Sequence, residues 1–365
     1  MSDPRPSDPT APSTTEPEIT TTVDLCEADG RTLNLAARGW SRQPLHRANL
    51  HGGWGRTKRW DYWAILAGDL VVSFLYADVD YLGLADVWWV DLATGRTGGH
   101  STVVPGAIGM ALPERPGTAP LLIDRRRFHL AITDDADLTT RVSASWVERD
   151  GSAGRLDASI ATPQGHESLN VVIPWSDRRF QFTSKHQARP AAGQLVIGDT
   201  VRRFGDGGAG TGDGEAWGVL DVGRGRWPYR TNWNWGGGAG RAVSTTTGRD
   251  HVVGLQLGGK WTEGTGFTEN AVIIDGRLTK LGSELRWDYA WDRPMSTWKV
   301  SDPAGRLSLE LHPRFDKHSR TEAGVMGTET HQVFGRWSGT VVGDGGEVLA
   351  FDDLQGFAEE SRSRW

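Results

Sequence analysis

The sequence predicts an all-β fold, and three observations support this prediction. From Val23 onward the apolar segments are short, rich in Val, Ile, Leu and Trp, and separated by Gly- and Asp-rich turns. Helical periodicity is nearly absent. Gly supplies 48 of the 365 residues, well above its usual share of about 7%. A chain of this length forms either two domains or one large barrel or sandwich.

Tight turns separate four pairs of these apolar segments. Asp-Gly dipeptides at 150–151 and 275–276 each lie between two alternating segments, as in a β-hairpin. The sequences DPAG at 302–305 and GDGG at 343–346 separate two further pairs. Four hairpins indicate antiparallel sheets.

Composition divides the chain into a tail and two domains. Residues 1–22 are rich in Pro, Ser and Thr and have almost no large apolar residue, so we expect a disordered tail. An exposed polar stretch around 174–193 predicts a boundary between an N-terminal β domain, 23–185, and a C-terminal one, 186–365. The Gly-rich segment 205–214 lacks the Gly-Lys-Ser/Thr of a phosphate-binding loop and is interpreted as a surface linker or lid of open role.

Charge and cysteine content exclude several classes of partner. The chain has 40 basic and 46 acidic residues and no basic block, so we expect no nucleic-acid partner. Cys26 is the only cysteine, which fits a reducing compartment. The longest apolar stretch, 64–76, contains Asp69 and is too short to span a bilayer. We therefore predict a cytoplasmic protein with no integral membrane segment; the sequence carries no signal for an oligomeric state.

The usual catalytic and metal-binding motifs are missing from the sequence. It has no Gly-x-Ser-x-Gly, His-Glu-x-x-His, Cys-x-x-Cys or dinucleotide-binding fingerprint, so serine hydrolase, zinc hydrolase, kinase and dehydrogenase interpretations fail. The nearest histidine pair, His312 and His318, has no partner that suggests a zinc site. We expect neither a metal nor an organic cofactor.

Tryptophan is the unusual component, because 18 Trp exceed 10 Phe and 5 Tyr combined. The segment 217–235 places Asp221 and several other polar residues among four Trp, where an alternating strand would point some of them into a dry interior. Burial there would raise the pKa of a carboxylic acid and make it a proton donor. The alternative is that Asp221 forms a buried ion pair with a nearby Arg.

Two further segments contribute candidate polar groups. Glu269 and Asn270 stand at the start of an apolar strand, where Glu269 either points into a cavity mouth or caps a turn. His331 and Gln332 begin a C-terminal strand, where the His is either a base or a structural residue. The predicted catalytic residues are Asp221, Glu269, Tyr229 and His331, and the predicted substrate-binding residues are Trp217, Arg224, Trp227, Arg230, Trp233, Asn234, Trp235, Asn270 and Gln332.

These segments carry a family resemblance. The blocks WGVLDVGRGRWPYRTNWNW, TENAVIIDGR, HQVFGRWSGT and GFAEESRSRW, with RWDYWAI as a weaker N-terminal block, resemble those of the domain of unknown function 2804 family, from about Leu45 to Trp365. That family is similar in outline to the carotenoid 1,2-hydratase and AttH-like proteins. The resemblance implies two tandem lipocalin-like antiparallel β-barrel or sandwich domains, and relatives that protonate or cyclise apolar substrates with cavity acids.

Two functions follow as hypotheses. The first is a cofactor-independent hydratase, isomerase or cyclase that acts on an apolar, isoprenoid or lipid-like substrate by acid catalysis in a Trp-lined cavity. The alternative is a non-catalytic lipocalin-like carrier of a hydrophobic small molecule. A carbohydrate-active protein with Trp stacking platforms is a weaker third interpretation.

Overall fold

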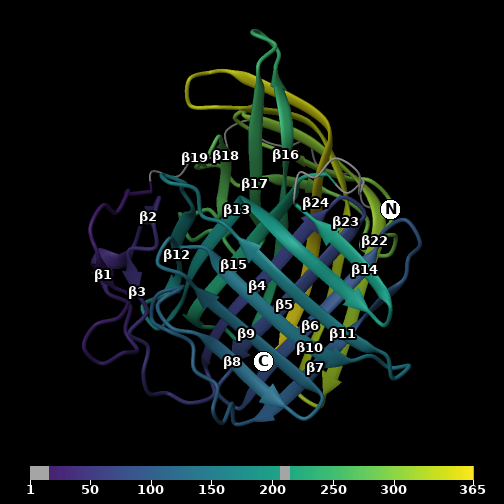
Figure 1. Cartoon of the computed structure of the whole chain (residues 1–365). Coiled ribbons are helices and arrows are strands. Elements are labelled where there is room, and N and C mark those ends of the chain that lie inside the picture. Colours follow the sequence, from purple (N-terminus) through teal and green to yellow (C-terminus); the bar gives the residue numbers. More distant parts are fainter. Residues whose placement is uncertain (1–15, 206–213, 365) are drawn as a thin grey trace.

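The protein consists almost entirely of β-strands in the computed structural model, which describes residues 16–205 and 214–364. The strands form two large antiparallel sheets and one small parallel pair (Figure 1). Within the described residues the one helical element is a 3-10 turn, η1 (Leu35–Ala37). The prediction of an all-β chain built on two antiparallel β units is confirmed.

The first sheet contains thirteen strands. They are β2 (Trp40–Ser41), β4 (Thr57–Ala67), β5 (Leu70–Asp78), β6 (Leu82–Asp91), β7 (Thr97–Pro105), β8 (Leu121–Arg125), β9 (Phe128–Asp134), β10 (Thr140–Val147), β11 (Ala153–Ile160), β12 (Leu169–Ser176), β13 (Arg179–Ile197), β14 (Thr200–Phe204) and β15 (Ala216–Arg226). The small pair is β1 (Val23–Asp24) and β3 (His46–Arg47).

The second sheet contains nine strands. They are β16 (Arg230–Ser244), β17 (Asp250–Gly259), β18 (Asn270–Ile274), β19 (Arg277–Leu281), β20 (Arg286–Asp288), β21 (Trp298–Ser301), β22 (Leu307–Ala323), β23 (Met326–Val342) and β24 (Val348–Arg364). Its order is β19-β18-β17-β16-β24-β23-β22-β21-β20. Consecutive strands are paired along β16–β19 and along β20–β24, and β24 joins the two runs by pairing with β16, so β19 and β20 stand at opposite edges.

All four hairpins read from turn chemistry are present. The turn at 150–151 joins β10 to β11, and the turn at 275–276 joins β18 to β19. The loops at 302–305 and 343–346 join β21 to β22 and β23 to β24. Gly276 has φ +81°, the left-handed conformation that Gly adopts without a steric penalty and that a tight hairpin turn requires.

The two sheets divide the chain later than the composition suggested. The expected boundary, 185/186, falls inside β13, which runs without interruption from Arg179 to Ile197 and pairs with β15 of the same sheet. The chain passes from the first sheet to the second between Arg226, the last residue of β15, and Arg230, the first of β16. Thr183 and Lys185 of this stretch are buried within β13 and bond Glu269 and Asp221, so the stretch forms part of a strand and not a linker.

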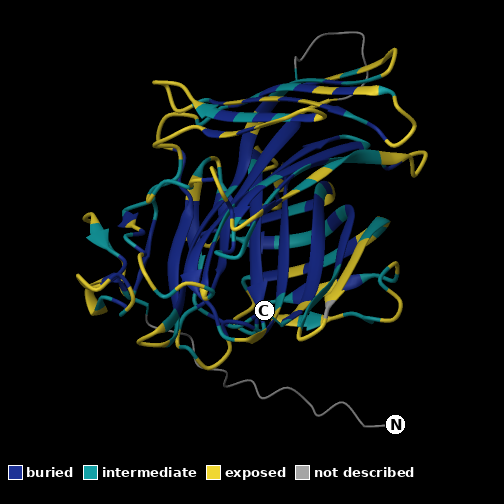
Figure 2. Ribbon diagram, turned by 90° about the horizontal axis from the view of Figure 1, so that it is seen from below, coloured by how far each residue is buried: buried dark blue, intermediate teal, exposed yellow. Residues whose placement is uncertain are grey.

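Each sheet encloses its own apolar core, and a third buried region lies between the sheets. Phe74, Leu130 and Leu156 belong to the core of the first sheet, and Trp298 and Trp337 belong to that of the second. In Figure 1 the yellow strands β23 and β24 run behind strands of the first sheet, and Figure 2 shows buried residues along the middle of the strands and exposed ones at the hairpin ends. The surface between the two sheets is called the junction below.

The N-terminal tail is ordered over part of its expected length. Residues 1–15 lie outside the described residues, but 16–22 are held against the rest of the molecule. The carboxylate of Glu16 is bound by the Nζ of Lys280 at 2.8 Å and by the backbone N–H of Thr268 at 3.0 Å. The prediction of disorder is therefore wrong for 16–22, because Glu16 meets a buried cation that composition does not reveal. The Gly-rich insert falls outside the described residues over 206–213.

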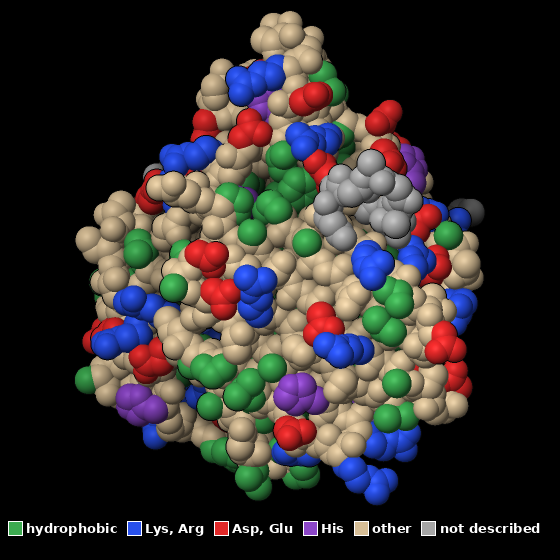
Figure 3. Space-filling model, viewed as in Figure 1, with side chains coloured by type: hydrophobic (Ala, Val, Ile, Leu, Met, Phe, Trp, Pro, Cys, Tyr) green, Lys and Arg blue, Asp and Glu red, His purple; other side chains and the backbone are tan. Residues whose placement is uncertain are grey.

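The surface has no dominant charge of one sign on the face in Figure 3, where basic and acidic side chains are interspersed. Among the described residues, none of the helical segments is long and apolar enough to cross a membrane. The single cysteine, Cys26, is buried in a cluster with Leu25 and Phe182.

Candidate active site

The junction holds a group of buried ionisable residues. It is formed on one side by β4, β13 and β15 of the first sheet, and on the other by β16, β23, β24 and the segment that leads into β18. Side chains alternate between the two faces of a strand, so only every second residue of each strand points to the junction. On β13 Thr183 and Lys185 point to the junction, and the intervening Phe182 points into an apolar cluster behind it.

Lys185 lies at the centre of this group. Its Nζ is 2.9 Å from Oδ1 of Asp221 and 3.0 Å from Oε1 of Glu269, so one ammonium bridges carboxylates from both sheets. The hydroxyl of Thr183 donates to the same Glu269 oxygen at 3.0 Å. The ammonium also lies 4.4 Å from the centre of the Trp235 ring, a cation–π contact. Lys185, Asp221 and Glu269 are only 5%, 7% and 1% exposed.

A third buried carboxylate, Glu359 of β24, completes the group, and each carboxylate accepts a hydrogen bond from an indole N–H. An indole nitrogen is only a donor, so it binds the carboxylate without adding charge. The three pairs are Trp60 with Asp221 (3.0 Å), Trp261 with Glu269 (3.1 Å) and Trp233 with Glu359 (2.7 Å).

A missing side chain allows one of these contacts. Gly223 on β15 stands opposite Trp60 on β4. A Cβ at Gly223 would lie 2.2 Å from the Trp60 ring, so any larger residue would push the indole away. Because Gly223 leaves this space free, the ring lies over β15 and its N–H reaches Asp221, two residues earlier on the same strand.

Burial changes the protonation of these acids. It raises the pKa of Glu359 to about 7, and the N–H of Trp233 and the charge of Lys185 offset only part of this effect. Burial also raises the pKa of Glu269 despite the adjacent Lys185. Burial alone would lower the pKa of Lys185, but Asp221 and Glu269 together raise it above its ordinary value. The junction therefore contains a fixed cation, Lys185, and a carboxyl group, Glu359, that is partly protonated near neutral pH.

A second lysine lies further along the junction. The Nζ of Lys317 on β22 donates to the hydroxyl of Ser73 at 3.1 Å and lies 4.4 Å from the centre of the Trp88 ring. Burial lowers the pKa of Lys317, while Asp86 and Glu359 raise it in part. Burial raises the pKa of Asp86. The charges of Lys185 and Lys317 both act to lower the pKa of Glu359, against the larger effect of burial.

Aromatic rings surround the acids. Trp227 and Trp261 stack at 5.8 Å between ring centres with an interplanar angle of 12°. Trp60, Trp175 and Trp233 lie against Trp227 at 5.4–5.7 Å. Trp227 and Trp261 are buried, while the other three rings are partly exposed, so the aromatic cluster extends from the carboxylates to solvent.

The junction brings together several residues that the sequence singled out. Gln332 accepts a hydrogen bond from the hydroxyl of Tyr62 at 3.1 Å, across the two sheets. Asp221 pairs with Lys185, so the alternative of an Arg partner for Asp221 is not what the structure shows. The predicted residues at or next to the junction are Asp221, Glu269, Trp227, Trp233, Trp235 and Gln332.

Three predicted residues lie on the opposite faces of the sheets. Arg224 is 1% exposed, and its Nη2 is 2.7 Å from Oδ1 of Asp61, inside the first sheet. On the second sheet, Asn234 donates to the hydroxyl of Tyr289 at 2.8 Å, and the Nδ1 of His331 lies 2.8 Å from Oδ2 of Asp316. Each of the three lies an odd number of positions from a junction residue on the same strand. Because side chains alternate between the two faces, each therefore points away from the junction.

The remaining predicted residues are peripheral or structural. Tyr229 is 38% exposed and donates to the carbonyl of Val325, and Arg230 is exposed at the start of β16. The amide of Asn270 bonds the backbone of Gly258 and Ser283, which fixes the loop beside Glu269. Trp217 lies at the far end of the interface between the sheets, where it lines a separate cavity of about 410 Å³.

The sequence analysis missed the residues that complete the site, Lys185 and Glu359. Both occupy alternating strand segments, FQFTSKHQ and GFAEESRS: Glu359 shares its face of β24 with Phe357, and Lys185 shares its face of β13 with the uncharged Gln181 and Thr183. An ionisable residue in a buried strand indicates that its charge is paired with another group, because unpaired charges are almost never fully buried. It does not name the partner, because the partner belongs to another strand.

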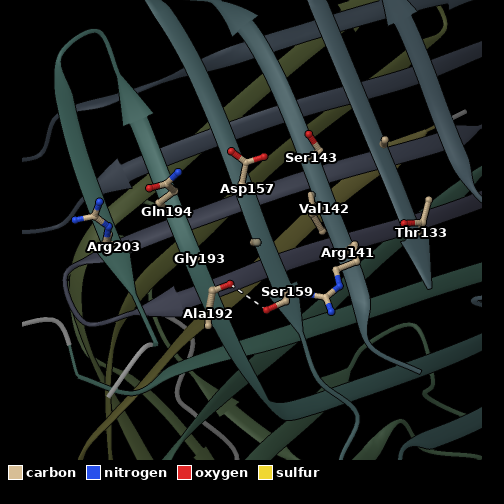
Figure 4. Close-up of a pocket in the computed structure, with 12 residues that line it drawn as sticks. Thr133, Arg141, Val142, Ser143, Asp157, Ser159, Ala192, Gly193, Gln194 and Arg203 are labelled. Carbon is tan, nitrogen blue, oxygen red and sulfur yellow. Dashed lines mark hydrogen bonds between the residues drawn. The ribbon is translucent and has the colours of Figure 1, made fainter. Parts of the chain in front are cut away.

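A hollow on the outer surface differs from the junction in chemistry. It measures about 630 Å³ and lies on the outer face of β9–β11, β13 and β14, where Figure 4 shows Arg141, Asp157 and Arg203. Arg141 and Arg203 are exposed and Asp157 is half-buried, so water solvates all three. The junction is therefore the stronger candidate for acid–base chemistry.

Three solved structures resemble this chain in fold. Kievitone hydratase from Nectria haematococca superimposes with a TM-score of 0.48 at 12% identity, covering 97% of this chain and 98% of that chain. A putative AttH from Nitrosomonas europaea gives 0.47 at 12% identity, covering 84% and 92%. CghA with Sch210972 gives 0.40 at 12% identity, covering 85% and 89%.

Sequence comparison places the chain in a family without assigning a reaction to it. None of the curated proteins matches the sequence. A family model does match, and it covers residues 16–365, which include both sheets and every residue of the junction. The chain belongs to the family described as Domain of unknown function (DUF2804).

Proposed function

We propose that the protein is an enzyme of the hydratase, isomerase or cyclase type, which protonates an apolar, isoprenoid or lipid-like substrate at the junction without an organic cofactor. One observation carries this proposal: three buried carboxylates gather around Lys185, each bound by an indole N–H. Perturbed acids in a dry aromatic setting are the arrangement that general acid catalysis requires.

Glu359 is the proton donor in this proposal. With its pKa raised to about 7, a large fraction of this carboxyl is neutral at physiological pH. A neutral carboxyl transfers its proton to one carbon of a C=C bond, and the positive charge develops on the other carbon. The faces of Trp227, Trp233 and Trp261 stabilise that charge through cation–π contacts.

The second half of the reaction returns a proton to the Glu359 carboxylate. In a hydration, water adds to the cationic carbon and its proton returns to the Glu359 carboxylate. In an isomerisation or cyclisation, a neighbouring C–H loses its proton to the same carboxylate. Glu269, whose pKa is also raised, is the second acid, and Lys185 and Asp221 orient the group and balance its charge.

The first test compares ligands carried by the protein. Wild type, Glu359→Gln and Glu269→Gln are purified from the native host, and organic extracts are examined by mass spectrometry. The matched control is Glu148→Gln, because Glu148 is another buried acid bound by two indoles, those of Trp89 and Trp146, but in the first sheet away from the junction.

An apolar compound that accumulates only in the two junction variants supports a stalled reaction. Incubating that compound with each protein should then give turnover by wild type and Glu148→Gln, and at least about 100-fold slower turnover by Glu359→Gln. Equal turnover by all four proteins would contradict the assignment of the acids.

A carrier is the second candidate, because the same Trp cluster binds an apolar molecule without chemistry. It predicts one unaltered ligand in all four proteins and no change in its mass after prolonged incubation. The absence of any apolar ligand and of turnover in all four proteins would contradict both candidates.

A further inference from the structure

A histidine-rich cluster occupies the face of the second sheet that points away from the junction. His318 on β22 and His331 on β23 are directly paired across the hairpin, and their rings stack at 4.3 Å between centres. Glu329 lies two residues before His331 and therefore on the same face of β23. Each of the three side chains offers a ligand atom, and these atoms all lie within 4.8 Å of one another.

We propose that His318, Glu329 and His331 bind one divalent transition-metal ion, with zinc as the best match. Two imidazoles and one carboxylate are a donor set that zinc prefers, and three protein ligands leave its fourth tetrahedral position open. Ligand atoms on one zinc ion lie roughly 3.3 Å apart when each bond is about 2.0–2.1 Å. Nε2 of His318 and Oε1 of Glu329 are already 3.0 Å apart, so small side-chain rotations complete the set.

The surroundings of His331 are those of a metal-binding histidine. Its Nδ1 lies 2.8 Å from Oδ2 of Asp316, which fixes the ring and leaves Nε2 as the nitrogen for a metal. Carboxylates bound to the second nitrogen of a ligand histidine orient the ring and raise its basicity. The Trp291 ring packs edge-on against His331 at 4.6 Å between ring centres, which restricts its rotation further.

The local charge favours a cation. Asp316 and Glu329 contribute two carboxylates beside the two imidazoles. Two arginines stand opposite Glu329, Arg320 on β22 and Arg362 on β24. Each has a carboxylate of its own, Glu322 at 3.8 Å from Arg320 and Glu360 at 2.8 Å from Arg362, so the two arginines are offset by two further acids. His318 is exposed, so a metal ion and water reach the cluster directly from solvent.

This site is independent of the proposed function. His331 and Gln332 are adjacent on β23 and point to opposite faces, and Gln332 contacts Tyr62 at the junction. A metal held by His331 therefore lies on the other side of the sheet from Glu359. The proposal for the junction can fail while the metal site stands, and the reverse is equally possible.

Metal binding by the purified full chain tests the proposal. The protein is dialysed against a chelator and then titrated with ZnCl₂ by calorimetry and with CoCl₂ by visible absorption, which reports tetrahedral coordination. Wild type should bind one ion per chain with a tetrahedral Co²⁺ spectrum, and Zn²⁺ should raise its melting temperature. His318→Ala and His331→Ala should lose this binding, and Asp316→Asn should weaken it about 10- to 100-fold.

The matched control is His312→Ala, because His312 is also an exposed histidine of β22 but bonds the hydroxyl of Ser338. This variant should bind Zn²⁺ as wild type does. His318 is exposed, so its replacement leaves the fold intact even where the His331 variant does not fold. A wild type that binds no ion, or a His318→Ala variant that binds it as tightly as wild type, would overturn the proposal.

Discussion

Glu359 and Glu360 are adjacent residues of β24 with opposite electrostatic behaviour. Glu359 faces the junction, where burial raises its pKa to about 7. Glu360 faces the other side of the sheet. Burial also acts to raise the pKa of Glu360, but hydrogen bonds from Arg362, Lys260 and Tyr289 hold it below its ordinary value.

The difference shows that the partners on each face decide the chemistry of a buried acid, and burial alone does not. Both side chains are nearly inaccessible to water, with Glu360 1% and Glu359 8% exposed, yet their pKa values shift in opposite directions. Glu360 forms ion pairs with Lys260 at 2.7 Å and Arg362 at 2.8 Å. Glu359 instead accepts a hydrogen bond from the neutral indole of Trp233 at 2.7 Å, and the Lys185 near it is already paired with Asp221 and Glu269. One face of the sheet is thus suited to hold charge and the other to release a proton.

The largest expected effect comes from removing the shared cation. Lys185→Met leaves Asp221 and Glu269 buried without their partner and should lower the free energy of unfolding by about 3–5 kcal/mol, measured by urea denaturation. The control is Lys299→Met, because Lys299 pairs with Glu310 at an exposed position and should change stability little. Equal stability of the two variants would show that the junction acids do not depend on Lys185.

The next largest effect is the dependence of the free energy of unfolding on pH. The pKa of Glu359 is raised from 4.5 to about 7 on folding, so its contribution to stability is complete below about pH 4.5 and is lost as pH rises through 7. The loss amounts to at most about 3 kcal/mol. Glu359→Gln should remove this part of the stability profile between about pH 4.5 and 7, and an unchanged profile in the variant would contradict the assignment.

A smaller effect is expected from the indole that binds Glu359. Trp233→Phe removes the N–H donor, which should cost about 1 kcal/mol and raise the pKa of Glu359 further, so the pH-dependent loss of stability should move to higher pH. Trp89→Phe is the matched control, because its indole binds Glu148 away from the junction. The control should lose stability without moving the profile, and a shift in both variants would mean that the indole contact is not specific.

The smallest change at neutral pH is expected from Glu360→Gln, because its partners Lys260 and Arg362 keep 35% and 46% of their side chains exposed and stay solvated. The sign of its pH dependence is opposite to that of Glu359. A lowered pKa stabilises the fold above the unfolded-state pKa, and this contribution is lost as pH falls through the folded-state value. The variant should therefore be less sensitive than wild type to acid unfolding, as measured by circular dichroism.

The aromatic composition and the Trp-rich segment led the sequence analysis to half of the site. Asp221 and Trp233 were identified because carboxylates among indoles are unusual in any strand, and Glu269 because it stands at the start of an apolar strand. Lys185 and Glu359 were missed since their role depends on strands far away in the chain. His331 was grouped with Gln332 by proximity in sequence, although alternation separates them by the thickness of the sheet.

The sequence by itself determined the strands and the four hairpins, because turn residues and alternating apolar positions act over a few residues. It also carried the family resemblance, which the match over residues 16–365 confirms. Only the tertiary structure decided that β13 belongs wholly to the first sheet and that Lys185 meets Glu269. Strand register and sheet packing join residues distant in sequence, and the charges of the junction are defined by that packing.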